Sequence, residues 1–171
     1  MMGPVKIRVE GVSKVFGRDP KAALAKVRAG MDKTRLMDET DHVLGLHDIT
    51  LDIRAGETFV IMGLSGSGKS TLIRHFNRLI EPTGGHILFD GEDILTFDAA
   101  RLQAFRRRKV AMVFQRFALL PHKTVAENVA YGLSLDGIPK AEARRRAGEQ
   151  IALVGLAGFE ESYPTQLSGG M

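Results

Sequence analysis

The sequence predicts an α/β fold, with an antiparallel β subdomain early in the chain and an α-helical subdomain appended at its end. Three observations support this fold class. Apolar and polar residues alternate along residues 5–9 and 49–53, as they do in half-buried antiparallel strands. A continuous apolar run at residues 58–62 is typical of a strand buried on both faces. The last third of the chain carries helix signals, which indicates that the helices gather after the strands.

The region between the two alternating strands has a different character. Residues 11–17 continue from the first strand as a second short strand or a turn. A small helical insertion then covers about residues 19–41. Pro20 suits the first position of a helix, and Gly30 can end that helix. Further along the insertion, residues 34–39 favour another short turn of helix.

The strand at residues 58–62 leads into a glycine-rich loop. Residues 63–71 read Gly-Leu-Ser-Gly-Ser-Gly-Lys-Ser-Thr and match the pattern G-x-x-x-x-G-K-[ST], and residues 72–80 follow with apolar positions at helical spacing. Such glycines let the backbone approach a polyphosphate, which loop amides and the helix N-terminus then bind. Lys69 can reach the terminal phosphates, and the Ser70 hydroxyl can bind Mg2+. The predicted contacts to a nucleoside triphosphate are Gly63, Ser65, Gly66, Ser67, Gly68, Lys69, Ser70 and Thr71.

The residues around the loop disfavour three alternative roles. A glycine-rich turn that binds nothing would not need the flanking strand and helix, the lysine and the serine together. A dinucleotide-binding loop is disfavoured because no glycine stands at position 71, so the pattern G-x-G-x-x-G fails. A GTPase is also disfavoured, because the chain has no N-K-x-D motif for reading guanine.

The elements after the loop continue this organisation. Residues 86–89 form a predicted strand, and Asp98 can cap a helix over residues 99–108. Residues 109–114 are predicted to form another buried strand, which ends at Gln115.

A helical subdomain is predicted over residues of about 116–171. Thr124 and Glu127 form a capping box ahead of a helix over residues 125–135. Pro139 opens the next helix, which ends at about Val154.

Composition narrows the function classes. The chain has 171 residues, of which 44% are hydrophobic, and no cysteine, so disulfides and thiolate metal sites are excluded. It shows neither a secretory signal nor an apolar run as long as a membrane span, which predicts a cytoplasmic protein. The net charge of +4 comes largely from basic runs at residues 106–109 and 144–146. Solvated helix faces account for these runs better than contacts with nucleic acid or anionic lipid, because acidic residues lie close by and aromatic residues are not interleaved.

Two further motifs follow the glycine loop in a fixed order. Residues 113–115 read Val-Phe-Gln, and residues 166–171 read Gln-Leu-Ser-Gly-Gly-Met. Each is weak alone, but the ordered set resembles the nucleotide-binding domain of ATP-binding cassette (ABC) transporters, with its P-loop, Q-loop and signature. The resemblance implies a P-loop NTPase core that binds ATP and Mg2+, and it identifies the whole of residues 1–171 as the N-terminal part of one such domain.

The resemblance also implies roles for residues outside the P-loop. Phe16 would lie in the A-loop and stack on adenine, although its residue type alone also fits a core aromatic. Gln115 would reach Mg2+ or the attacking water, and its loop would contact the membrane subunits. The signature residues Ser168, Gly169 and Gly170 would meet the γ-phosphate held by the opposite protomer. Two such domains would therefore pair head-to-tail as a homodimer.

A narrower resemblance concerns transported solutes. Residues 17–22, 117–125 and 127–133 look like the corresponding segments of importers for glycine betaine and proline. This implies an ATP-binding subunit at the inner face of the plasma membrane, which works with transmembrane permease subunits and indirectly with a substrate-binding protein. No nucleic-acid partner is expected.

The chain departs from the family pattern at its end. It stops inside the signature, and neither an apolar run ending in Asp-Glu nor a switch histidine follows. Residues 86–90 do not replace that run, since they precede Gln115. We therefore expect no catalytic residue within the chain and no turnover by the chain alone. Two alternatives to an importer ATPase remain open: a nucleotide-binding fragment without turnover, and a non-transport ABC protein that acts on nucleic acid.

Overall fold

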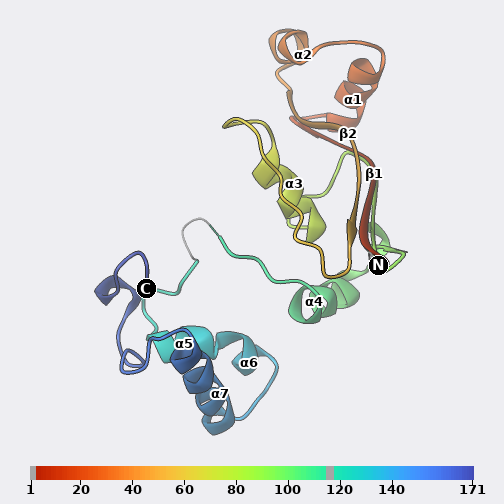
Figure 1. Ribbon diagram of the computed structural model, residues 1–171. Coiled ribbons are helices and arrows are strands. Elements are labelled where there is room, and N and C mark those ends of the chain that lie inside the picture. Colours follow the sequence, from red (N-terminus) through yellow and green to blue (C-terminus); the bar gives the residue numbers. More distant parts are fainter. Residues whose placement is uncertain (1–2, 115–117) are drawn as a thin grey trace. The chain divides into compact units, whose positions relative to one another are not determined.

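The computed structural model describes residues 3–114 and 118–171. Contacts between residues divide the chain into two compact units, Met1–Val110 and Ala111–Met171 (Figure 1), and each unit is described by itself. Within the described residues, every helix is too short or too polar to cross a membrane.

The first unit is built on a four-stranded sheet. Its strands are β1 (Val5–Phe16), β2 (Val43–Arg54), β3 (Gly84–Phe89) and β4 (Glu92–Asp93), in the order β2-β1-β3-β4. Every pair is antiparallel, which confirms the predicted antiparallel β subdomain.

Strand β1 is longer than the alternation at its start indicated. The segment predicted as a second strand or turn continues β1, which changes register between Val9 and Val12 where it pairs with β2. Gly11 supplies the backbone turn at this bulge with a φ of 58°. Val9 pairs with Leu51 on one side and Ile87 on the other, so β1 is a central strand.

The core of the first unit packs against this sheet. Val9, Val12 and Ile87 are fully buried against Leu72 and Phe105. The ring of Phe105 meets the rings of Phe89 and Phe97 edge-to-face, with centroids 5.1 and 5.8 Å apart. The core therefore fixes α3 (Lys69–Phe76), the 3₁₀ helix η1 (Ile94–Thr96) and α4 (Ala99–Arg108) to the sheet. Asp98 caps α4 as predicted, accepting a hydrogen bond from the Arg101 N–H at 2.7 Å.

The predicted insertion forms two helices, α1 (Pro20–Arg28) and α2 (Lys33–Thr40). Asp19 and Asp32 cap them by accepting hydrogen bonds from backbone N–H groups. Buried residues from both helices and from β1 form a second core beside the sheet: Val15, Ala23, Leu24, Val27 and Leu36. Phe16, the last residue of β1 before the insertion, pairs with Val43, the first residue of β2 after it.

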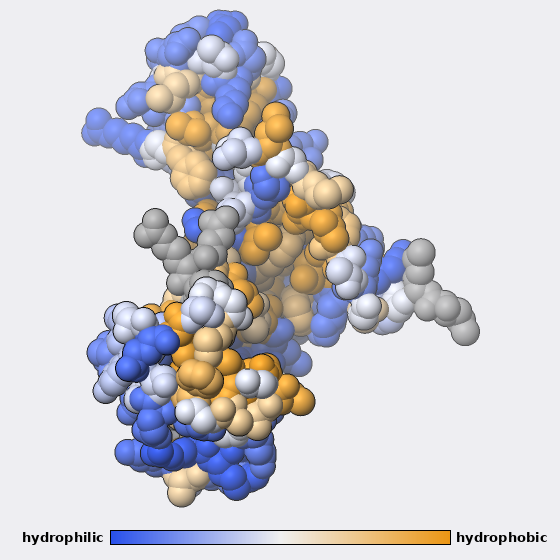
Figure 2. Space-filling model, turned by 60° about the vertical axis from the view of Figure 1, so that its left-hand side comes forward, coloured by the Kyte–Doolittle hydropathy of each residue, from blue (hydrophilic) through white to orange (hydrophobic). Residues whose placement is uncertain are grey.

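Two predicted strands are absent from the described residues. Residues 58–62 and 109–114 have no assigned secondary structure, and Val60, Met62 and Val113 are 67%, 86% and 90% exposed. A strand needs hydrogen-bonded neighbours, and no described strand lies beside either run. Figure 2 shows that hydrophobic residues are exposed on the surface of the molecule.

The helix after the glycine loop is also shifted from its prediction. It begins at Lys69 and ends at Phe76, short of Ile80. Arg78 adopts a φ of 54°, which turns the chain out of the helix.

The second unit is helical. It contains α5 (Val125–Val129), α6 (Tyr131–Leu135), α7 (Lys140–Leu153) and the 3₁₀ helix η2 (Pro164–Gln166). The capping box between Thr124 and Glu127 is present as predicted, but the helix that follows is divided at Ala130 into α5 and α6. Val125, Ala126 and Ile151 form the buried centre of this unit.

Candidate functional site

The glycine loop precedes α3 directly, and Gly68 is the N-cap residue of that helix. Gly66 and Gly68 have φ values of 77° and 89°, a backbone region that glycine adopts at little cost. The Ser67 N–H donates to the Leu64 carbonyl at 3.3 Å, which closes a turn within the loop. The chain is thus folded into a tight loop that opens into a helix N-terminus.

Gly68 is required for space as well as for conformation. A Cβ at this position would lie 2.6 Å from the carbonyl oxygen of Gly45 and 3.0 Å from Cδ2 of Leu46. Gly45 and Leu46 belong to β2, so the loop rests directly on the backbone of that strand. Gly45 was not singled out in the sequence, although a glycine between apolar strand residues is a signal for close backbone approach.

Lys69 spans the loop. Its Nζ donates to the carbonyls of Gly63 at 2.8 Å and Leu64 at 2.6 Å, and lies 3.4 Å from Oγ of Ser67. The ammonium charge is therefore held at the loop backbone rather than extended into solvent. Because a positive charge, loop amides and a helix N-terminus meet here, the arrangement suits a multiply charged anion.

The remaining loop side chains supply hydroxyl oxygens. Ser65, Ser67 and Ser70 are exposed, and Ser70 lies in the first turn of α3 beside Lys69. A hydroxyl is a hard oxygen ligand of the kind Mg2+ prefers, so Ser70 fits a metal bound next to phosphate. Thr71 is half-buried, and its carbonyl accepts a hydrogen bond from within the helix.

That hydrogen bond comes from His75, which is fully buried in α3. Its Nδ1 donates to the Thr71 carbonyl at 2.6 Å, and Nε2 is buried without a protein partner. Burial lowers the pKa of His75, the charge of Lys14 lowers it further, and the bond to Thr71 opposes the shift. His75 is therefore a neutral core residue that braces the start of α3, and the described residues contain no cluster of potential metal ligands that would include it.

Phe16 lies at the end of β1 with 39% of its surface exposed. Its ring packs over Gly45, since a Cβ on Gly45 would lie 2.7 Å from Cε2 of Phe16. The Lys14 ammonium lies 5.1 Å from the centroid of the same ring. Gly45 thus contacts Phe16 through its Cα and Gly68 through its carbonyl, so the structure brings the predicted adenine-stacking residue and the glycine loop together around one residue of β2.

The other predicted site residues do not belong to the described part of the first unit. Gln115 lies outside the described residues. Ser168, Gly169 and Gly170 belong to the second unit, where they follow η2 and are exposed, and the Met171 N–H donates to the Ser168 carbonyl at 3.0 Å.

The basic runs take part in local ion pairs and hydrogen bonds. Arg106 donates to the carbonyls of Asn77 and Arg78, which ties α4 to the end of α3. Three arginines of α7 pair with glutamates: Arg144 with Glu161, Arg145 with Glu142 and Glu149, and Arg146 with Glu142.

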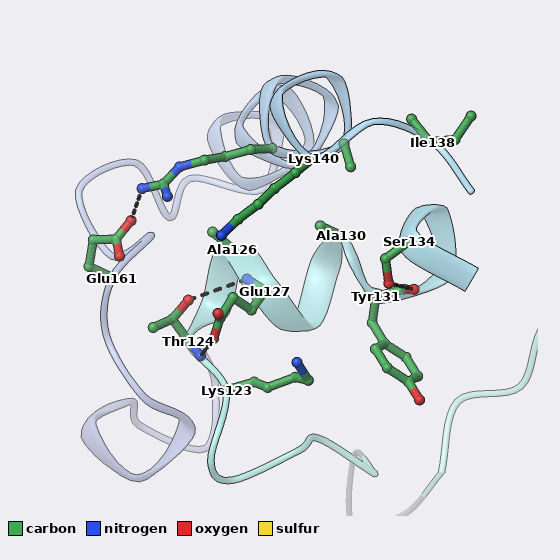
Figure 3. A pocket seen from close by; sticks show the side chains of 12 residues that line it. Lys123, Thr124, Ala126, Glu127, Ala130, Tyr131, Ser134, Ile138, Lys140 and Glu161 are labelled. Atoms are coloured by element: carbon green, nitrogen blue, oxygen red, sulfur yellow. Dashed lines mark hydrogen bonds and ion pairs between the residues drawn. The ribbon is translucent and has the colours of Figure 1, made fainter. Parts of the chain in front are cut away.

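The second unit contains a cavity of about 410 Å³ among α5, α6 and α7 (Figure 3). Ala126, Ala130 and Ile138 contribute apolar wall, and Lys123 and Lys140 contribute charge. The capping box of Thr124 and Glu127 lies beside it, as Figure 3 shows.

Comparison with known families identifies the chain. Residues 46–171 match the family described as ABC transporter. The chain belongs to the ABC transporter family. This assignment covers the glycine loop, α3 and the entire second unit, and it confirms the resemblance found in the sequence.

Curated ABC relatives are identical to this chain at about half of the aligned positions. The glycine betaine transport ATP-binding protein OpuAA of Bacillus subtilis is 51% identical over 98% of the chain and 40% of its own length. The glycine betaine/proline betaine transport system ATP-binding protein ProV of Escherichia coli is 48% identical over 98% of the chain and 42% of its own length. The trimethylamine N-oxide transport system ATP-binding protein TmoW of Ruegeria pomeroyi is 47% identical over 99% of the chain and 49% of its own length. The chain spans less than half the length of these three ABC relatives.

Solved ABC structures share the fold. A dimeric ATP-binding cassette in a post-hydrolysis state, bound to ADP and Pi, superposes with a TM-score of 0.76 at 30% identity, covering 96% of this chain and 64% of that one. A dimeric bacterial ABC transporter cassette gives a TM-score of 0.75 at 32% identity. The chain therefore has the α/β fold of an ABC cassette, with its antiparallel sheet and helical region.

Proposed function

We propose that this chain is the ATP-binding subunit of an ABC importer for glycine betaine and related osmoprotectants. One observation carries the nucleotide assignment: the Lys69 ammonium is held 2.8 and 2.6 Å from the carbonyls of Gly63 and Leu64, inside a glycine loop that opens into α3. The solute class is supported by the glycine betaine relatives at 51% and 48% identity.

The triphosphate would bind along the P-loop. The amides of the loop and the first turn of α3 would donate to phosphate oxygens, and Lys69 would neutralise the terminal phosphates. The contacting residues would be Gly63, Ser65, Gly66, Ser67, Gly68, Lys69, Ser70 and Thr71. Phe16 would stack on adenine, because its exposed ring is fixed to Gly45 beside the same loop.

Ser70 would hold Mg2+ together with phosphate oxygens, and Gln115 would contribute a second protein ligand. When bound, Mg2+ neutralises charge on the β- and γ-phosphates. We assign no residue of this chain to activation of the attacking water, so we expect the chain by itself to bind ATP without rapid turnover.

Two copies of the chain would enclose two nucleotides. Ser168, Gly169 and Gly170 are exposed in the second unit and would meet the γ-phosphate held by the other copy. The dimeric state of both cassettes named above supports this arrangement. The subunit would work at the cytoplasmic face of the membrane with permease subunits, and a substrate-binding protein would act through them. The cavity among α5, α6 and α7 supports a permease contact, because an apolar wall with flanking charges suits a partner helix.

The decisive experiment is equilibrium binding of a fluorescent ATP analogue to the Lys69→Ala variant. Loss of the ammonium should weaken binding by at least about tenfold, since a charged hydrogen-bond donor to phosphate contributes about 1.5–3 kcal/mol. Lys21→Ala, which removes an exposed lysine from α1, is the matched control and should bind like the unchanged chain. Equal affinity for all three proteins would refute the nucleotide site.

A further inference from the structure

The imidazole of His42 joins the two ends of the insertion. Its Nδ1 lies 2.5 Å from the carbonyl oxygen of Thr40, the last residue of α2, and its Nε2 accepts a hydrogen bond from the Asp19 N–H at 3.1 Å. Asp19 is the N-cap residue of α1. A single side chain therefore links the start of the first inserted helix to the end of the second.

The same ring covers the residue that follows Phe16. Gly17 has a φ of 145°, and a Cβ on it would lie only 2.2 Å from Cδ2 of His42. The imidazole is thus packed directly on the backbone of Gly17.

Strand pairing also brings His42 close to Phe16. Val43, the next residue after His42, is paired with Phe16 across β1 and β2. Strand pairing with Val43 thus fixes Phe16 itself, and the His42 ring fixes the backbone of the residues that follow Phe16.

Both ring nitrogens of His42 have definite roles. A carbonyl oxygen only accepts a hydrogen bond, so Nδ1 carries the proton that bonds Thr40. The Asp19 N–H only donates, so Nε2 must be the unprotonated acceptor. A neutral imidazole with the proton on Nδ1 satisfies both groups, whereas an aliphatic side chain satisfies neither.

We propose that His42 is a positioning residue for Phe16, and that it sets the affinity of the site for the adenine base without acting on the phosphates. This inference rests on the proposed ATP-binding function. The ring holds the backbone of residues 17–19 against the start of β2, which keeps the Phe16 ring over Gly45. Without this bridge, the turn after Phe16 gains freedom, and the ring must be ordered when the base binds.

The test compares ATP with inorganic tripolyphosphate, which offers the phosphates without a base. Both would be measured on the full chain by competition against a fluorescent ATP analogue. His42→Leu should weaken ATP by about tenfold, the order expected when an aromatic–base stack is lost. Tripolyphosphate should bind the variant unchanged, which also shows that the variant folds.

Three further variants sharpen the result. His42→Gln should restore much of the ATP affinity, because its amide oxygen can accept from the Asp19 N–H where Nε2 does. His47→Leu removes an exposed histidine from β2, the strand that begins after His42, and should change the binding of neither ligand. Phe16→Ala should weaken ATP alone, and adding His42→Leu to it should cause no further loss.

The outcomes separate the inference from the proposed function. The positioning role is overturned if His42→Leu leaves ATP binding intact while Phe16→Ala weakens it, or if His42→Leu weakens ATP and tripolyphosphate equally. Failure of the unchanged chain to bind either ligand would instead refute the proposed function.

Discussion

The carbonyl oxygen of Gly45 faces Gly68 so closely that a Cβ on Gly68 would lie 2.6 Å from it. This contact joins β2 to the N-cap residue of α3, the helix that follows the glycine loop. Because Gly45 also supports the Phe16 ring, one glycine of β2 fixes the separation between the residues proposed to bind the base and the phosphates.

Gly68→Ala should therefore damage both the loop and the fold. The new methyl group would clash with Gly45, and alanine would be strained at a φ of 89°. We expect the free energy of unfolding to fall by about 1–3 kcal/mol. We expect the affinity for a triphosphate to fall by more than about tenfold. Chemical denaturation and ligand titration would measure the two effects.

The matched control is Gly148→Ala in α7, where a Cβ meets nothing within 4 Å. Alanine in a helix interior should stabilise the chain by about 0.5–1 kcal/mol. If Gly68→Ala and Gly148→Ala had the same effect, the contact with Gly45 would contribute nothing to the free energy of unfolding or to triphosphate binding.

Arg78→Ala should destabilise the first unit. The guanidinium donates to the carbonyls of Phe97 at 2.7 Å and Ile94 at 3.3 Å, and these acceptors would lose their partner. We expect a loss of about 1.5–3 kcal/mol in the free energy of unfolding, as for hydrogen bonds to a charged group. Arg35→Ala removes an exposed pair with Glu39 on α2 and should cost less than about 1 kcal/mol. Similar losses for the two variants would contradict a structural role for Arg78.

His75 should make stability depend on pH below the ordinary histidine pKa. Its folded-state pKa is lowered from 6.5, mainly by burial, so the unfolded chain binds a proton more readily than the folded chain. Stability is therefore full above pH 6.5 and falls as pH drops from there toward the folded-state pKa. In urea denaturation followed across this range, His75→Leu should show a flatter pH dependence than the unchanged chain. An unchanged slope would indicate that other groups cause the effect.

Glu142 should titrate far below a normal glutamate. Hydrogen bonds from Arg145 and Arg146 lower its pKa from 4.5 to about 2. Because the folded-state pKa is depressed, the contribution of this carboxylate to α7 is present above pH 4.5 and is lost as pH falls toward 2. NMR titration of the side-chain carboxyl carbon would measure the pKa directly. Arg145→Gln should move it back toward 4.5, and a pKa that stayed at 2 would show that Arg145 is not its cause.

Sequence reasoning succeeded where structure depends on neighbours along the chain. Asp98 and the pair of Thr124 and Glu127 cap helices as predicted, because a cap and its helix lie within a few residues of each other. The glycine loop was located in the same way, since it depends on residues 63–71, although α3 begins at Lys69 rather than at residue 72 as predicted. The division at Ala130 between α5 and α6 has no such local signal.

It failed where structure depends on distant partners. Residues 58–62 have the composition of a buried strand, but strand geometry needs hydrogen-bonded neighbours, which the described residues do not place beside them. Gly45 and His42 were missed for a related reason. Their importance comes from contacts with Gly68, Gly17 and Asp19, which are distant in sequence and are brought near only by the pairing of β1 with β2.

If the hydrogen bond between His42 and the Asp19 N–H strengthens adenine binding, bound adenine must in turn stabilise the helix that Asp19 caps. Free-energy coupling between two sites is reciprocal, so a bridge that helps the chain hold adenine must be strengthened by adenine to the same extent. Bound nucleotide would then slow amide hydrogen exchange in the first turn of α1, although the capping and core contacts of that helix include no residue of the glycine loop. The insertion would thus report on whether the site is filled, and a protein bound to α1 and α2 could sense nucleotide without reaching it.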